Sequence, residues 1–274
     1  MNNYRPAGRL TPAVKFIIIA NVVMFVLSSL WLRTKGMDLS KVLGLYMPQS
    51  DNWRIYQYVT HMFMHSNQGI GHIFFNMFAV FMFGRILESV WGPKRFILFY
   101  LLTGLGAAFL HSLIGWIRIN SMQTAFAAFQ AAPAPQLLAE FVHAHIAHPA
   151  AWVWEFIDAW GGNPADVGYV RKGMEIFQVV IRDASNIPTV GASGAVFGLL
   201  VAFGMLFPNT ELFLMFIPIP VKAKYFVIGY GLLELYLAVL NQAGDNVAHF
   251  AHLGGLVFGY ILVKWWNRSR YEFY

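Results

Sequence analysis

A serine framed by small residues is the first feature of this sequence with the chemistry of a catalyst. Ser193 lies in the run Gly-Ala-Ser-Gly-Ala-Val-Phe-Gly over residues 191–198, shortly after Pro188. Proline and glycine favour a turn, and the apolar residues that continue to Phe207 favour a helix. Small neighbours leave the hydroxyl accessible and allow a second backbone to approach. Ser193 is therefore predicted at the start of a buried helix, either as a nucleophile or as a packing residue.

A histidine within a later apolar stretch is the matching candidate base. Gly255 and Gly259 follow His252 with the spacing of a close contact between helices. The histidine and Gly255 are three residues apart, so they lie near one face of a helix, and the helix after Ser193 is the natural partner. Ser193 and His252 are then expected to form a dyad, in which the imidazole takes the hydroxyl proton and returns it to the leaving amine. The alternative is a histidine that only lines a polar cavity.

No acidic third member of the site is obvious from the sequence, and a second histidine competes for the role of base. Glu234 and Asp245 are acids, but no spacing connects either of them to His252. His249 lies three residues before His252 and is the competing base. We expect it about one turn nearer the outer end, where water reaches it. His252 is deeper, as Ser193 is, and is therefore the predicted base.

The composition identifies a membrane protein. Of 274 residues, 58% are hydrophobic and only 12% are charged, which is too apolar for a soluble globular chain. The formal net charge of +6 is explained by lysine and arginine at helix ends, so no nucleic-acid partner is predicted. The sequence contains no cysteine, which excludes disulfides, thiolate catalysis and cysteine metal ligands.

Six apolar stretches are predicted as spanning helices of an all-α polytopic protein. They run over about 14–32, 71–91, 96–116, 193–207, 225–240 and 247–266. The fourth rises only about 22 Å, whereas the hydrocarbon core is about 30 Å thick. Its start should therefore be recessed in a wet pocket inside the membrane. The distribution of lysine and arginine favours both termini inside, with Ser193 opening outward.

Two connections are long enough to form structure of their own. Residues 33–70 mix aromatic, histidine and basic residues, and are predicted to pack at the membrane interface. Residues 117–188 are predicted as an extramembrane insertion of two or three amphipathic helices on the membrane surface, one of them over about 167–183. The whole chain, 1–274, is otherwise treated as one membrane domain.

Together these motifs resemble those of the rhomboid family of intramembrane serine proteases. The resemblance covers all six predicted spans in order. The matching residues are Trp53 and Arg54; His72 and Asn76, followed by Gly84, Arg85 and Glu88; Gly191, Ser193 and Gly194 of Gly-x-Ser-Gly; and Ala251, His252, Gly255 and Gly259 of Ala-His-x-x-Gly-x-x-x-Gly.

The resemblance implies a fold, a reaction and further site residues. It implies a six-helix bundle that cleaves a peptide bond in or near the transmembrane segment of single-span substrates in the lipid bilayer. It also implies that His72 and Asn76 form the oxyanion hole with the backbone N–H of Ser193. Phe197 stands where the family often has tyrosine, and its ring is expected to stack on His252. No cofactor is expected, and the expected location is a bacterial cytoplasmic membrane.

Other histidines and the arrangement of the two halves bear on alternative functions. His61 and His65 have a spacing that can bind metal, and His143, His145 and His148 cluster, but packing and interfacial roles are favoured and no metal is predicted. A transporter is disfavoured because the two halves show no repeat. A catalytically inactive rhomboid-like protein that binds membrane clients is the remaining alternative.

Overall fold

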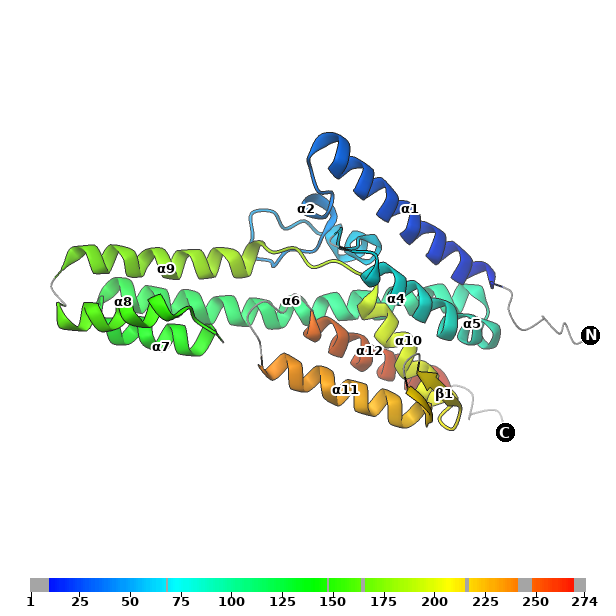
Figure 1. Ribbon diagram of the computed structural model, residues 1–274. Helices are drawn as coiled ribbons and strands as arrows, with labels where there is room; N and C mark the ends of the chain where they lie inside the picture. The colour runs from blue at the N-terminus through cyan, green and yellow to red at the C-terminus, as the bar shows by residue number, and fades with distance from the viewer. Residues whose placement is uncertain are drawn as a thin grey trace, which may run out of the picture.

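The computed structural model describes residues 10–67, 69–146, 148–163, 166–214, 217–240 and 248–268 (Figure 1). The elements, in chain order, are α1 (Pro12–Lys35), α2 (Ser40–Leu43), α3 (Gln57–Thr60), the short helix η1 (His61–Phe63), α4 (Gly71–Ala79), the π-helical turn η2 (Val80–Gly84), α5 (Arg85–Trp91), α6 (Pro93–Ala131), α7 (Pro135–His145), α8 (Ala151–Gly162), α9 (Val167–Asn186), α10 (Ser193–Leu206), β1 (Glu211–Leu214), β2 (Ile217–Lys222), α11 (Ala223–Leu240) and α12 (His249–Arg268).

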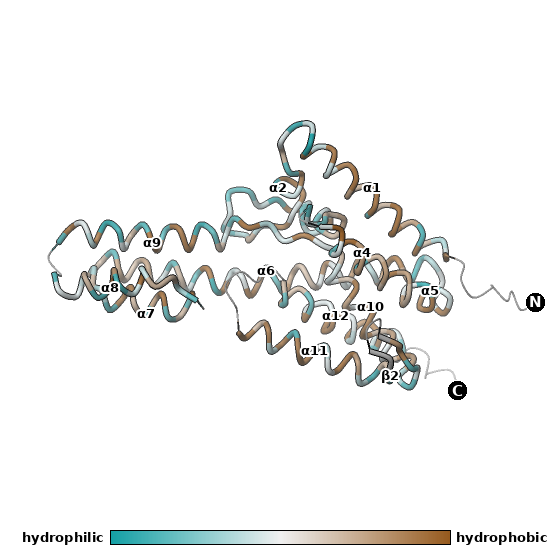
Figure 2. The backbone as a smooth tube through the Cα atoms, in the orientation of Figure 1, coloured by the Kyte–Doolittle hydropathy of each residue, from teal (hydrophilic) through white to brown (hydrophobic). Residues whose placement is uncertain are grey.

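The helices confirm an all-α membrane protein. Within the described residues, four helical stretches are long and apolar enough to cross a bilayer: α1, the continuous run α4–η2–α5, α6 and α11. Their apolar colouring is visible along each tube in Figure 2. α10 is apolar but shorter, at 14 residues. The count of six spans stays a prediction, because α10 and α12 fall outside the set that length and hydropathy identify.

α6 is longer than the predicted third span. We expected that span to end near Trp116, but the helix continues without a break to Ala131 and is 39 residues long, or about 58 Å. Residues 117–131 contain neither glycine nor proline, and they bury Met122 and Phe129 on one side. The helix ends where Pro133 follows Ala132, because proline disfavours helical geometry in the residue before it.

The extended end of α6 carries the segment predicted as an insertion. α7, α8 and α9 gather there, away from β1 (Figure 1). They share a second apolar core with α6, built around Phe129, Phe141, Trp160 and Phe177. The predicted helix over 167–183 is present as α9, and the Asp166 carboxylate accepts the N–H of Gly168 at its start (2.7 Å). The position of these helices relative to a membrane surface stays a prediction.

A small β-hairpin joins α10 to α11 and was not predicted. β1 and β2 pair antiparallel, with Glu211 opposite Lys222. The N–H of Ala223 donates to the carbonyl of Thr210 (2.8 Å) and closes the pair where α11 begins. The alternation of apolar and β-branched residues in so short a stretch is a weak signal. Pro218 and Pro220 also obscure it, although a two-stranded ladder has only edge strands, where proline is tolerated.

α10 is the centre of the main bundle. Its residues from Gly194 to Leu200 are all buried, as expected for a helix that is apolar on every side. α4, α6 and α12 lie around it in Figure 1. Glu88 connects α5 to the start of α1. Its carboxylate accepts hydrogen bonds from the hydroxyl of Thr11 and from the N–H groups of Ala13 and Val14. Glu88 is therefore a cap for α1.

Candidate functional site

The segment before α10 is fixed to the rest of the protein by hydrogen bonds. Thr189 and Leu45 exchange both backbone hydrogen bonds, of 2.9 and 2.8 Å. The Thr189 hydroxyl also lies 2.8 Å from Nε2 of His111, on α6. The N–H of Gly191 donates to the carbonyl of His61 (3.0 Å). The start of α10 is therefore positioned by α6 and by the connection over residues 33–70, which we call the early loop.

Gly191 adopts a backbone conformation that favours glycine. Its φ is +131°, and a Cβ placed there would lie 2.9 Å from Nε2 of His72. The same Cβ would lie 3.6 Å from Oγ of Ser193. The serine hydroxyl and the His72 ring therefore border the same small space, which only the absence of a side chain at residue 191 keeps open.

Ser193 is the first residue of α10 and is partly buried. The N–H groups in the first turn of a helix have no acceptor within that helix, so they point out of its start. The positive end of the helix dipole lies at the same place. The hydroxyl therefore lies beside donors that are suited to a developing negative charge.

α12 crosses α10 at small residues. A Cβ on Gly255 would lie 1.9 Å from the carbonyl oxygen of Gly194, and one on Gly259 would lie 3.0 Å from Cα of Gly198. One turn along α10, the ring of Phe197 stacks on the ring of His252, with centroids 4.3 Å apart and planes at 14°. The crossing therefore places His252 at the level of the first turns of α10, where Ser193 lies.

Glu234 joins this group and was not selected from the sequence. One oxygen of its carboxylate, Oε2, lies 2.9 Å from Nδ1 of His252 and 2.6 Å from Nδ1 of His249. All three residues are buried. An acidic residue within an apolar span was the signal available in the sequence, because such residues are rare and usually functional. The other acid considered, Asp245, lies outside the described residues.

His249 differs from its prediction. We expected water to reach it, but its exposed fraction is 8%, the same as that of His252. The carboxylate of Glu234 on α11 occupies the position beside its ring. Burial therefore does not indicate which of the two histidines is the base. Their positions do, because the ring of His252 stacks on Phe197 of α10.

His72 and Asn76 lie one turn apart on α4. The Asn76 amide donates to the carbonyl of His72 (2.8 Å), which leaves its second N–H for another acceptor. The His72 ring also meets the ring of His65 edge-on, with centroids 5.2 Å apart. Burial lowers the pKa of His65 to about 4, and the neighbouring His72 adds to the effect. A neutral His65 therefore supports the His72 ring without adding a charge.

The histidines considered as metal ligands have other environments. Nδ1 of His61 faces the carbonyl of Gln57 (2.8 Å), and burial lowers its pKa to about 4. The ring of His145 lies against Phe141. Within the part of the chain that the structure describes, Glu234, His249 and His252 are the group whose ligand atoms all lie within 4.8 Å of one another.

The remaining matched motif residues have structural contacts. Arg54 is exposed, and its guanidinium donates to the carbonyls of Asp51 (2.8 Å) and Trp53 (2.7 Å). The guanidinium of Arg85 lies over the ring of Phe81, 4.8 Å from its centroid. These contacts hold the early loop and the α4–α5 run in shape.

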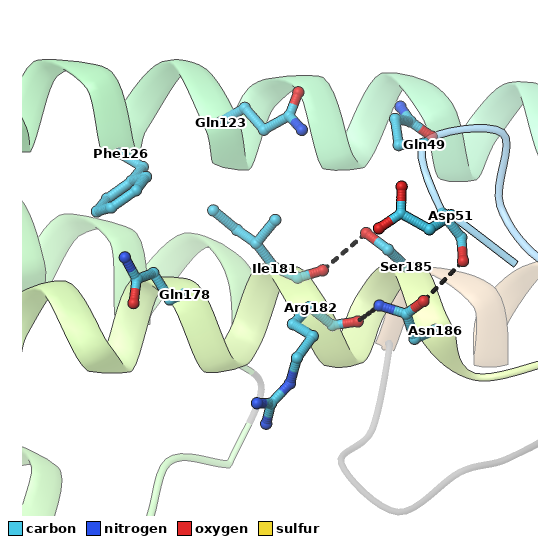
Figure 3. A pocket seen from close by; sticks show the side chains of 10 residues that line it. Gln49, Asp51, Gln123, Phe126, Gln178, Ile181, Arg182, Ser185 and Asn186 are labelled. Atoms are coloured by element: carbon cyan, nitrogen blue, oxygen red, sulfur yellow. Dashed lines mark hydrogen bonds between the residues drawn. The ribbon is translucent and has the colours of Figure 1, made fainter.

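A separate hollow of about 350 Å³ opens where the early loop meets the insertion (Figure 3). Gln49 and Asp51 reach it from the loop, Gln123 from α6, and Gln178 and Asn186 from α9. Polar side chains line much of it, and it contains none of the residues predicted for catalysis. The candidate active site is therefore the group around Ser193, not this hollow.

These observations define a polytopic helical membrane protein with a serine at the head of a short central helix and a histidine on the helix that crosses it. The family model described as the rhomboid domain matches residues 52–117 and 171–267, and the chain belongs to the rhomboid family. The segment between the two matched stretches carries all of α7 and α8. The matched stretches contain the residues grouped around Ser193, namely His72, Asn76, Phe197, Glu234, His249 and His252.

Three relatives are similar to parts of this chain. An uncharacterized mitochondrial rhomboid protein of Schizosaccharomyces pombe is 28% identical over 74% of this chain and 50% of its own length. The mitochondrial RHOMBOID-like protein 12 of Arabidopsis thaliana is 25% identical over 94% of this chain and 59% of its own. A candidate rhomboid protease of Bacillus subtilis, YdcA, is 30% identical over 38% of this chain and 50% of its own.

The lengths and the locations of the relatives both bear on this chain. This chain spans 50% and 59% of the length of the first two, so their whole-protein properties do not transfer directly. The expectation of a bacterial cytoplasmic membrane is not supported, because those two relatives are named as mitochondrial. An integral membrane location stands.

Proposed function

We propose that this protein is an intramembrane serine endopeptidase that cleaves single-span membrane proteins within or near their transmembrane segments. The observation that carries the proposal is the crossing of α10 and α12, which stacks Phe197 on His252 at the level of Ser193. Family membership supports the reaction class. A nucleophile, a base and several donors that meet in a buried place are the parts that acyl transfer needs.

The reaction runs through two acyl-transfer steps. Oγ of Ser193 attacks the scissile carbonyl carbon while Nε2 of His252 takes the hydroxyl proton. The tetrahedral intermediate then expels the amine, which leaves with that proton, and an ester to Ser193 remains. Water attacks this ester with His252 again as base, and the acid product departs as the serine hydroxyl is restored. All steps use side chains of this chain, and no cofactor or metal enters the scheme.

Three donors are assigned to the developing oxyanion. They are the backbone N–H of Ser193, the ring of His72, which borders the space at Gly191, and the amide of Asn76, which lies one turn from His72 on α4. Donors fixed before the reaction stabilise the intermediate by a few kcal/mol each, because they need no reorganisation in a site from which most water is excluded.

The recessed start of α10 explains how water reaches a bond inside the membrane. Fourteen residues rise about 21 Å, which is short of the hydrocarbon thickness of about 30 Å. A start below the membrane surface is tolerable only beside protein or water. Ser193 is assigned to such a cavity, open to the side opposite the two termini.

The test is cleavage of a panel of single-span substrates by the purified protein in liposomes. Ser193→Ala should abolish cleavage and labelling by a serine-reactive phosphonate while leaving thermal unfolding unchanged. Ser185→Ala in α9 is the matched control, because its hydroxyl donates within its own helix, to the carbonyl of Ile181 (2.8 Å). Cleavage at the wild-type rate by folded Ser193→Ala protein would refute the proposal. A wild-type protein that binds these substrates but never cleaves them would favour a client-binding role.

A further inference from the structure

Glu234 is a buried acid whose neighbours are the two histidines of α12. It is 3% exposed, and the rings of His249 and His252 both face its Oε2 atom. A carboxylate inside a membrane-spanning helix is costly unless partners satisfy it. Two imidazole nitrogens lie within hydrogen-bond distance of this buried acid. We therefore look for a role of Glu234 beyond packing.

The hydrogen bonds determine which ring nitrogen of His252 carries the proton. An ionised carboxylate only accepts hydrogen bonds, so Nδ1 of each histidine must donate to Oε2. Nε2 of neutral His252 then has a free lone pair. This is the tautomer that a base needs when it takes a proton from a serine hydroxyl.

Phe197 and Glu234 restrain the His252 ring in complementary ways. Stacking on Phe197 fixes the plane of the imidazole but leaves rotation within that plane free. The hydrogen bond to Glu234 fixes that rotation, since only one orientation places Nδ1 at 2.9 Å from Oε2. The two contacts together give the ring a single orientation.

The distances favour a proton-linked cluster over a metal site. Three ligands around zinc, each about 2.0–2.1 Å from the ion, lie about 3.3 Å from one another in tetrahedral geometry. Oε2 lies only 2.6 and 2.9 Å from the two nitrogens. Those are distances of charge-assisted hydrogen bonds.

We propose that Glu234 is a positioning residue that completes a Ser193–His252–Glu234 triad, an inference that rests on the proposed function. When Nε2 of His252 accepts the serine proton, the ring becomes an imidazolium, and the Glu234 carboxylate pairs with it. The proton stays on His252 until the amine or the serine oxygen takes it back, so Glu234 is never protonated in the cycle. His249 lies beside the same oxygen and gives the buried carboxylate a second hydrogen-bond partner.

The experiment compares Glu234→Gln with Glu88→Gln. Both replace a buried carboxylate by an amide, but the hydrogen bonds of Glu88 among the described residues go to the start of α1. In soluble serine proteases the amide in place of the triad acid lowers kcat by about 10⁴-fold, because it favours the wrong tautomer. We expect Glu234→Gln to lower kcat by about 10²- to 10⁴-fold with little change in KM. Glu88→Gln should lower the unfolding temperature and keep the wild-type kcat.

The outcomes separate this inference from the proposed function. If Ser193→Ala is inactive and folded Glu234→Gln keeps the wild-type kcat, the triad is overturned and the dyad stands. If Ser193→Ala retains cleavage, the proposed function itself fails. Loss of wild-type activity on chelation, with recovery on adding zinc, would overturn the inference by making Glu234 a metal ligand.

A second measurement does not depend on the folding of Glu234→Gln. In ¹⁵N-histidine-labelled wild-type protein, the signals of His252 are those absent from His252→Ala. The inference requires a protonated Nδ1 and an unprotonated Nε2 in the neutral ring. A neutral His252 with its proton on Nε2 would overturn it.

Discussion

Adding one methyl group at Gly255 should uncouple the base from the nucleophile. A Cβ at residue 255 would lie 1.9 Å from the carbonyl oxygen of Gly194, whereas Cβ contacts under 3.0 Å are essentially never seen. The clash is with backbone, so a rotamer change cannot relieve it. In Gly255→Ala the two helices must therefore separate by about 1.1 Å at this level.

That separation acts directly on the proposed dyad. His252 lies less than one turn from residue 255, and Ser193 precedes Gly194, so a shift at the crossing moves base and nucleophile apart. A base must lie within about 2.6–3.2 Å of the proton donor, and a misplacement of about 1 Å costs on the order of 10²-fold in rate. We expect kcat of Gly255→Ala to fall about 10²-fold and the unfolding temperature to fall with it.

Gly229→Ala is the matched control for this assay. Residue 229 lies in α11, and among the described residues no atom beyond its chain neighbours and its own helix backbone lies within 4 Å of the position where its Cβ would stand. Alanine is a better helix former than glycine by up to about 1 kcal/mol, so this variant should fold at least as well as wild type. Both variants are assayed on one transmembrane substrate in liposomes. A folded Gly255→Ala protein with the wild-type kcat would refute the crossing as the device that aligns the site.

Three further outcomes test single roles in the site. Asn76→Ala should lower kcat with little change in KM, because a donor to the oxyanion acts in the transition state; a raised KM at constant kcat would move Asn76 to substrate binding. Activity should survive exhaustive treatment with EDTA or phenanthroline, and recovery of a lost activity by zinc would instead indicate metal ligation. His252→Ala should eliminate turnover and phosphonate labelling, whereas His249→Ala should retain substantial activity. The reverse pattern would overturn the assignment of the base.

The parts of the fold that the sequence predicts well are those set by local composition. The second span was expected over 71–91 and is found there as α4, η2 and α5. The fourth was expected over 193–207 and ends at Leu206. Both begin next to glycines and are mainly apolar, so hydropathy and turn residues suffice to bound them.

The parts that the sequence does not predict depend on contacts between distant residues. The continuation of α6 beyond Trp116 goes with the burial of Met122 and Phe129 in a core shared with α7–α9, which the edge of the apolar run does not indicate. The meeting of Glu234 with His249 and His252 depends on how α11 packs on α12, and 15 and 18 residues separate the partners in sequence. No periodic pattern specifies that register.

The continuity of α6 links the insertion to the candidate site. Near its middle, Ala107 packs against Gly194, close enough that a Cβ on that glycine would lie 2.5 Å from the alanine side chain. One turn further on, His111 bonds to Thr189 in the segment that precedes Ser193. The same helix then supplies Met122 and Phe129 to the core of the insertion.

α6 is continuous over 39 residues, so one unbroken ladder of backbone hydrogen bonds joins the part beside Gly194 to the part within the insertion. The connection from α9 to α10 is a second link between the insertion and the start of α10. It begins after Asn186, whose side chain accepts a hydrogen bond from Ser50 of the early loop (2.6 Å), and it includes Thr189, which bonds to His111. The insertion is therefore attached to the start of α10 by two routes, one helical and one through the loop.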